Sequence, residues 1–299
     1  MGGLGDGQPR HGHCNAPGVD KRLAILHANC QGPPLAEILL ASPEFARSHA
    51  PRVFLNYARQ DIPEADLAAC GLFLYQHLGP EWGELSSAAL LSKLPAGCER
   101  LCIPNMFFRG PWPLWSGAPG FDYRDVYLDH LLDMGLPRRD ILHLYLSTPL
   151  ERKYDLDALL AETAARETQR QAHTPVKYLE HVLEHWRERP LFLSVNHPGP
   201  ELLALAAAGI LRHLGLAGPD PARLAHATAL GAGYADFELP LHPQAAAFYC
   251  LGSGGLGYGG EAQVYNVYGR GKTFAQYAAA YVDCRLAGID DFIGYLHLR

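Results

Sequence analysis

The thiol of Cys30 stands in the most informative segment of this chain. An apolar run over residues 22–28 ends just before Asn29 and Cys30, and a Gly-Pro-Pro sequence from Gly32 then begins a stretch with apolar residues at helical spacing. Proline is tolerated in the first turn of a helix because its missing N–H would have no partner there. The pattern predicts a strand, a sharp turn that carries the thiol, and the N-terminus of a helix.

A cysteine in such a turn is suited to nucleophilic chemistry or to contact with an anionic ligand. In α/β proteins the carboxyl ends of parallel strands carry the sites, and the positive end of a helix dipole favours thiolate over thiol. We therefore expect Cys30 to have a lowered pKa. A buried structural thiol is the alternative, since free cysteines are among the most buried residues.

A second segment repeats this pattern later in the chain. The apolar run over 191–195 is followed by Asn196 and His197, and then by a Pro-Gly-Pro sequence that begins another helix. An imidazole within hydrogen-bond distance of a thiol makes that thiol a nucleophile at neutral pH. We predict that Cys30 and His197 form a catalytic pair, with Asn196 lining the site. Capping of the next helix or bonding to a loop is the alternative role of His197.

Amide side chains follow two further predicted strands. Gln76 ends one of them, and Asn105 follows the other. If these strands are parallel and adjacent, their ends meet at the edge that carries Cys30. Gln76 and Asn105 would then donate hydrogen bonds to an oxyanion, beside the backbone N–H groups of Gln31 and Gly32. Bracing of loops is the alternative role.

Only scattered cations are candidates for binding phosphate. The Gly-rich stretch 252–260 opens no helix and has no P-loop Lys-Ser/Thr pair, so a hinge or lid is the better interpretation. Arg109, Arg270 and Lys272 are the candidates to meet a phosphate group. The seven cysteines lack the second ligand pair that a zinc site requires, so we expect no metal.

The composition is that of a globular protein with a substantial core. The chain has 299 residues, of which 48% are hydrophobic and 19% charged, and these values fit one large domain or two intimate halves. A net charge of −6 argues against a nucleic-acid partner. No apolar run has the length of a membrane span, and no signal-peptide core precedes residue 20. With free thiols, these features lead us to expect a cytoplasmic protein.

Strands and helices that position these residues alternate along the first half of the chain. The predicted strands lie at 22–28, 72–77, 100–104 and 141–146, and the predicted helices lie at 33–41, 84–94 and 124–134. Such alternation predicts an α/β fold with a largely parallel sheet flanked by helices. The second half is more helical, with a polar stretch at 151–189, an apolar helix at 201–214, a loop-rich segment at 217–247 and a last helix at 272–287. We expect a disordered tail over 1–20, an α/β part over 21–150, and a helical part over 151–299 packed as one unit with it.

These motifs resemble the WcbI family of bacterial polysaccharide-biosynthesis proteins. The resemblance is carried by Asn29-Cys30-Gln31-Gly32 after a first strand, Tyr75-Gln76, Ile103-Pro104 with a Phe-rich sequel, and Asn196-His197-Pro198 before a helix. It runs from about residue 22 to 288. It implies acetyl transfer with coenzyme A as co-substrate, with Cys30 and His197 as the catalytic pair and Gln31 and Gln76 lining the site.

The sequence departs from the family pattern at a few positions. Ala28 stands where glycine is commoner, His77 where proline is expected, and residues 108–112 are an aromatic variant of their segment. These departures leave the chemistry intact but bear on the acceptor, which the resemblance implies to be a carbohydrate or a nucleotide sugar.

Several functions remain open at this point. An acetyltransferase could use either of two mechanisms. In one, Cys30 carries the acetyl group as a thioester before His197 activates a sugar hydroxyl; in the other, His197 acts alone as the base and Cys30 shapes the pocket. A rival is an SGNH-like esterase or deacetylase, although Ser194 stands where such enzymes place an aspartate. A third is a non-catalytic nucleotide-binding module, in which Cys30→Ser would change no activity.

Overall fold

We describe a computed structural model of the chain, which covers residues 21–229, 236–252, 258–260 and 262–298. The predicted tail over 1–20 and the centre of the Gly-rich stretch lie outside the described residues. None of the described helices is both long and apolar enough to cross a bilayer.

A four-stranded parallel sheet carries the first part of the chain, in the order β2-β1-β3-β4. This confirms the predicted fold class. Successive residues of the central strand β1 point to opposite faces of the sheet: Ala24 and Leu26 face one apolar cluster, and Ile25 faces the other. The strands are β1 (Arg22–Ala28), β2 (His49–Leu55), β3 (Cys70–Tyr75) and β4 (Glu99–Cys102).

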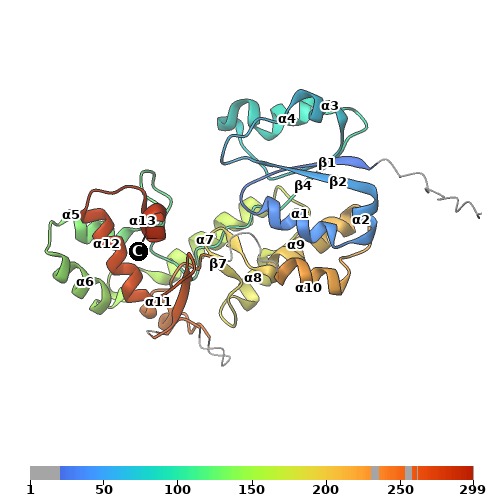
Figure 1. The fold of residues 1–299 in the computed structure, drawn as a ribbon. Coiled ribbons are helices and arrows are strands. Elements are labelled where there is room, and N and C mark those ends of the chain that lie inside the picture. Colours follow the sequence, from blue (N-terminus) through green and yellow to red (C-terminus); the bar gives the residue numbers. More distant parts are fainter. Residues whose placement is uncertain (1–20, 230–235, 253–257, 261, 299) are drawn as a thin grey trace, which may run out of the picture.

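Helices cover both faces of this sheet (Figure 1). On one face lie α1 (Gly32–Leu40) and α2 (Pro43–Ser48), and α1 packs against α9 (Pro200–His213) and α10 (Pro221–Ala229) from much later in the chain. On the other face lie α3 (Glu64–Ala69), the short 3₁₀ helix η1 (Pro80–Leu85) and α4 (Ser87–Lys93).

A second lobe consists mainly of helices (Figure 1). In it α12 packs against both α5 and α6. Its elements are β5 (Trp115–Ser116), β6 (Arg124–Asp125), α5 (Val126–Asp133), α6 (Arg138–Ser147), η2 (Leu150–Arg152), α11 (Pro243–Phe248), β9 (Val264–Val267), β10 (Arg270–Thr273), α12 (Phe274–Leu286) and α13 (Phe292–Leu298). Between the lobes run α7 (Leu156–Gln171), α8 (Leu179–His185), β7 (Phe192–Ser194) and β8 (His197–Pro198).

Each lobe draws elements from both sides of residue 150. The sheet lobe takes α9 and α10 from the later part, and the helical lobe takes α5 and α6 from the earlier part. One apolar cluster runs through both, from Ala24 to Leu296. Composition changes near residue 150, but packing does not divide there.

Two predicted elements differ from the structure, and one strand was not predicted. The segment 141–146 is not a strand but part of α6, in which the buried Ile141 and Tyr145 lie one helical turn apart. The run 191–195 is outside the parallel sheet, because Asn196 begins a tight return and β7 pairs antiparallel with β8. The edge strand β2 was not predicted, since it carries Pro51, which an edge position tolerates.

Candidate active site

The carboxyl edge of the sheet has the topology of an α/β binding site. The chain goes from β1 to β2 on one side and then crosses back to β3 on the other, so the strand order reverses between β1 and β3. In open α/β sheets such a reversal leaves a crevice outside the strand ends. Cys30 follows β1, and amide side chains follow all four strands: Asn29, Asn56, Gln76 and Asn105.

Gln76 lies at the centre of a group of amide side chains. We call this group, which consists of Asn29, Gln31, Asn56, Gln76 and Asn105, the amide cluster. Its Oε1 accepts hydrogen bonds from the Asn29 backbone N–H (2.8 Å) and from Asn56 Nδ2 (3.4 Å). Its Nε2 lies 3.1–3.3 Å from the oxygens of Asn29, Gln31 and Pro104. With 1% of its surface exposed, Gln76 uses both ends of its amide to brace the turn that carries Cys30.

Gln31 joins this turn to two distant segments. Its Nε2 donates to the carbonyl oxygens of Met106 (2.7 Å) and Asn196 (3.0 Å), and its Oε1 accepts from the Met106 N–H (3.2 Å). Three segments that the sequence singled out therefore meet at one edge: those of Cys30, Asn105 and Asn196. The Gln31 side chain is also buried and fully engaged, so its geometry is that of a bracing group.

The backbone N–H groups of the turn are engaged as well. The Gln31 N–H donates to Asn29 Oδ1 (2.9 Å), and the Gly32 N–H donates to the Asn29 carbonyl (2.9 Å). Gly32 permits a close approach of α1 to the sheet, because a Cβ there would lie 2.9 Å from Val53 Cγ1 and 3.1 Å from Ala28 Cβ. The turn is thus tightly packed.

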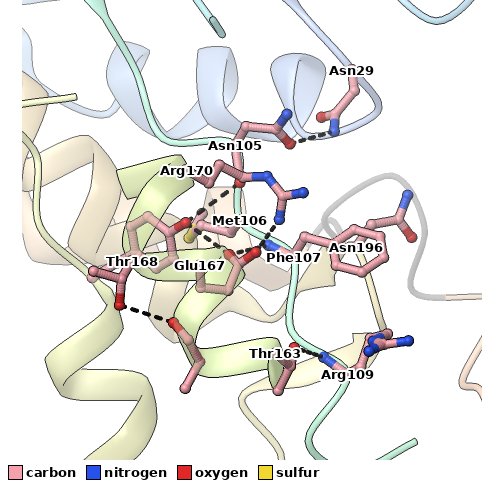
Figure 2. A network of polar contacts seen from close by, with 12 residues as sticks. Asn29, Asn105, Met106, Phe107, Arg109, Thr163, Glu167, Thr168, Arg170 and Asn196 are labelled. Carbon is pink, nitrogen blue, oxygen red and sulfur yellow. Dashed lines mark hydrogen bonds and ion pairs between the residues drawn. The ribbon is translucent and has the colours of Figure 1, made fainter. Parts of the chain in front are cut away.

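Asn105 is oriented differently from the other amides. Its Oδ1 accepts from Asn29 Nδ2 (3.2 Å), as Figure 2 shows. Its own Nδ2 makes no hydrogen bond within the part of the chain that the structure describes. Of the predicted oxyanion donors, the half-buried Asn105 is the side chain that keeps an N–H group for a ligand.

The Cys30 thiol is half-buried and lies 3.9 Å from Asn196 Nδ2. Burial raises its pKa to about 11, although its own backbone N–H acts in the opposite direction. The expected lowering of this pKa was therefore wrong. The N–H groups at the start of α1 bond to Asn29, and desolvation outweighs the effect of the helix end.

Asn196 is held by a chain of hydroxyl groups. Its Oδ1 accepts from the hydroxyl of the fully buried Ser194 (3.3 Å), and Ser194 shares a hydrogen bond with Tyr123. This chain leaves the Asn196 amino group directed at Cys30. Tyr123 was missed in the sequence, where nothing in its surroundings distinguishes it from a core aromatic.

His197 lies on β8, next to Asn196, and is half-buried. Burial lowers its pKa to about 4, and the nearby Asp236 carboxylate offsets this in part. The imidazole is therefore neutral at pH 7, the form in which it accepts a proton. Its pairing with Cys30 stays a prediction.

Helix α7 braces the segment that follows β4 from the opposite side (Figure 2). Glu167, which is 1% exposed, accepts hydrogen bonds from the Phe107 N–H (3.0 Å) and the Tyr178 hydroxyl (2.9 Å), and it pairs with Arg170. Burial raises the Glu167 pKa to about 7. The neighbouring Thr163 accepts from the Arg109 N–H (3.1 Å).

The sequence did not point to these α7 residues, because they lie in the stretch 151–189, which is polar overall. The available signal was spacing: Leu156, Leu160, Thr163 and Glu167 recur every three or four residues and share one face. Leu156, Thr163 and Glu167 are the buried residues of the helix.

The three candidate phosphate-binding cations do not converge. The Arg109 guanidinium donates to Glu162 (3.2 Å) and to the Trp115 carbonyl (3.3 Å), so it is engaged within the protein. Arg270 and Lys272 lie on the β9–β10 hairpin, where Arg270 is exposed. Within the described residues, no hydrogen bond or ion pair joins these three side chains to the amide cluster, and no group of His, Cys, Asp or Glu is placed to hold a metal ion.

Comparison with known proteins adds two findings. A family model described as the polysaccharide biosynthesis enzyme WcbI matches residues 23–219. The fold matches a solved structure described as native WcbI, a novel polysaccharide biosynthesis enzyme, without a disulfide bond between coenzyme A and one of its cysteines. That match has a TM-score of 0.72 at 17% sequence identity and covers 93% of this chain and 91% of the other. A search of curated proteins gave no match.

Proposed function

This chain belongs to the WcbI family of polysaccharide biosynthesis enzymes, and from that premise we propose that it transfers an acetyl group from acetyl-coenzyme A to a sugar hydroxyl. The acceptor in this proposal is a carbohydrate or a nucleotide sugar. The reaction would take place in the cytoplasm, where the cysteines of the described residues, which are free, stay reduced.

The observation that carries the proposal is the Cys30 thiol at the strand-order reversal, held by the amide cluster and faced by Asn196 Nδ2 at 3.9 Å. The related solved structure is described as lacking a disulfide bond between coenzyme A and one of its cysteines, and such a bond would require the coenzyme thiol and a cysteine thiol to meet. We assign Cys30 as the residue that meets the coenzyme thiol end here.

The proposed reaction has two steps. In the first, the Cys30 sulfur attacks the thioester carbonyl while His197 takes the thiol proton; the carbon–sulfur bond to the coenzyme breaks, and His197 returns the proton to the coenzyme thiolate. In the second, His197 takes the proton of a sugar hydroxyl, whose oxygen attacks the acetyl-Cys30 thioester and releases the Cys30 thiol with that proton.

At neutral pH the two groups are in the protonation states from which this order of proton transfer starts. With a pKa of about 11, Cys30 is a thiol at neutral pH, so it needs a base at the moment of attack. With a pKa of about 4, His197 is a free base at that pH. Asn105 Nδ2 and Asn196 Nδ2 are the side-chain donors that we assign to the developing oxyanion.

The test is intact-protein mass spectrometry after incubation with acetyl-coenzyme A and no acceptor. We expect a gain of one acetyl group, which Cys30→Ala abolishes and Cys250→Ala, a variant of an exposed cysteine, retains. His197→Ala should slow acetylation by about 10²–10⁴-fold, whereas His143→Ala, on an exposed face of α6, should not. Absence of an adduct, with an active Cys30→Ala enzyme, would leave His197 as sole base and remove the covalent step.

A further inference from the structure

Two tyrosines of the helical lobe have a backbone conformation that bulky residues seldom adopt. Tyr123 has a φ of 50° and Tyr268 a φ of 52°, both in the left-handed region that favours glycine. Tyr268 and Gly269 join β9 to β10, and both have the positive φ that a type I′ hairpin turn requires. Asparagine is the usual first residue of such a turn. A tyrosine strains it, so the reason for the tyrosine lies in what its side chain contacts.

Both tyrosine rings stack on the buried ring of Phe237. The ring centroids of Tyr123 and Phe237 lie 4.6 Å apart, and those of Phe237 and Tyr268 lie 4.9 Å apart. Phe237 is 1% exposed, and a β-bridge to Val267 ties it to β9. The Tyr268 ring also lies against the ring of His297, with centroids 4.0 Å apart. This packing holds the two phenol rings in place.

The hydroxyl groups of the two tyrosines begin a series of hydrogen bonds that ends at the candidate site. Tyr268 bonds to Tyr123, and Tyr123 bonds to the fully buried Ser194. We call these three hydroxyl groups the hydroxyl chain. Ser194 Oγ donates to Asn196 Oδ1 (3.3 Å), and Asn196 Nδ2 lies 3.9 Å from the Cys30 sulfur. Stacking of the rings does not require the hydroxyl groups, since phenylalanine stacks in the same way.

The single proton on each hydroxyl group fixes the direction of the hydroxyl chain. Asn196 Oδ1 carries no proton, so Ser194 donates to it. The Ser194 oxygen is then an acceptor for Tyr123, and the Tyr123 oxygen is an acceptor for Tyr268. Because its Oδ1 is occupied, the Asn196 amide presents its N–H group to Cys30. A flipped amide would present an acceptor to the sulfur instead.

We infer that Tyr123 and Tyr268 are positioning residues that keep Asn196 oriented as a hydrogen-bond donor toward the reacting thioester. The inference rests on the proposed function, in which Asn196 Nδ2 stabilises the oxyanion that forms when Cys30 is acetylated. It also accounts for the strained hairpin turn. Asparagine at position 268 would relieve the strain but would remove the first hydroxyl of the chain.

Single-turnover acetylation of Cys30 by acetyl-coenzyme A, followed by rapid-quench mass spectrometry, tests the inference. Asn196→Ala should lower the rate constant at saturating acetyl-coenzyme A by about 10²–10³-fold, which is the usual effect of losing one oxyanion donor. Tyr123→Phe should lower it by about tenfold, and Tyr268→Phe, one hydrogen bond further away, by about threefold. The half-saturating concentration should stay the same in both tyrosine variants, because their hydroxyl groups act through Asn196 and do not bind the substrate.

Two controls separate positioning from stability. Tyr281→Phe removes a hydroxyl group that donates to Asp129 (2.8 Å) and is not part of the hydroxyl chain, so it should lower the melting temperature without changing the rate. In an Asn196→Ala background, Tyr123→Phe should have no further effect on the rate. Wild-type rates in Tyr123→Phe and Tyr268→Phe, or a full further loss in the double variant, would overturn the inference.

Failure of the proposed function would look different. If the wild type forms no acetyl-Cys30, the covalent step is refuted, and the orientation of Asn196 is followed by NMR through its side-chain NH2 resonances, which Asn196→Asp identifies by their loss. A shift of these resonances in Tyr123→Phe and Tyr268→Phe, but not in Tyr281→Phe, would support the positioning role. Unchanged resonances would refute it.

Discussion

The two walls of the candidate site differ in the kind of group that holds them. The sheet edge around Cys30 is braced by neutral amides, with Gln76 and Gln31 fully engaged. The α7 wall is braced by charge, through Glu167 and Arg170. Burial beside neutral amides raises the pKa of the Cys30 thiol, whereas the α7 wall carries a buried ion pair. The two walls should therefore respond differently to substitution and to pH.

The largest effect should come from breaking the neutral wall at its centre. Gln76→Leu removes both ends of an amide that contacts four residues and leaves their buried polar groups unpaired. We expect the free energy of unfolding, measured by urea titration, to fall by about 4 kcal/mol. Gln60→Leu, at an exposed position with one backbone hydrogen bond, should change it by less than about 1 kcal/mol. Similar values for the two variants would refute the bracing role.

The α7 wall should make the free energy of unfolding depend on pH. The Glu167 pKa is raised from 4.5 to about 7 by burial, so the folded protein holds a proton there that the unfolded chain has released. The stabilisation is present below pH 4.5 and is lost as the pH rises to 7, by about 3 kcal/mol. In urea titrations at several pH values, the free energy of unfolding of Glu167→Gln should lack this slope, whereas that of Glu162→Gln should keep it. An unchanged slope would show that Glu167 titrates normally.

The neutral wall should have the opposite slope. His27, on β1 beneath the Cys30 turn, is 1% exposed, and burial lowers its pKa from 6.5 to about 4. Its contribution is present above pH 6.5 and is lost as the pH falls to 4, again by about 3 kcal/mol. Unfolding titrations of His27→Leu should lose this acid sensitivity, and titrations of exposed His143→Leu should keep it. If the contributions of His27 and Glu167 to the free energy of unfolding changed with pH in the same direction, the contrast between the two walls would be refuted.

The smallest expected effect concerns thiol reactivity. A pKa of about 11 in place of 9.0 reduces the thiolate fraction of Cys30 by about 100-fold at neutral pH. Peptide mapping after brief iodoacetamide treatment should therefore find Cys30 alkylated much more slowly than the exposed Cys250. Preferential labelling of Cys30 would mean that a neighbouring group deprotonates the free thiol, contrary to the neutral character of its wall.

The sequence predicted best what depends on local order along the chain. The strand–turn–helix at Cys30 was evident because an apolar run, a thiol and a proline pair are adjacent, and the polar strand ends at Gln76 and Asn105 were found in the same way. The segment 141–146 was misassigned because a short apolar run does not distinguish strand from helix. The spacing of the buried residues Ile141 and Tyr145, which lie one helical turn apart on α6, is that of a helix.

The parts that the sequence could not give depend on distant residues. The Cys30 pKa follows from burial by segments more than a hundred residues away, which no local pattern reports. Whether Gln76 braces or catalyses depends on the partners of its amide, and those come from three other strand ends. The bracing role of Glu167 could be predicted only by knowing which face of α7 contacts the segment after β4.

The packing of α1 against α9 has a consequence for synthesis on the ribosome. The apolar face of α1, with Leu35, Ile38 and Leu39, is completed by a helix that begins only at Pro200. At ordinary rates of translation the chain between them takes roughly 10–30 s to emerge. During that time the nascent sheet exposes a hydrophobic surface directly behind the Cys30 turn, and this surface is where a chaperone is expected to bind the unfinished protein.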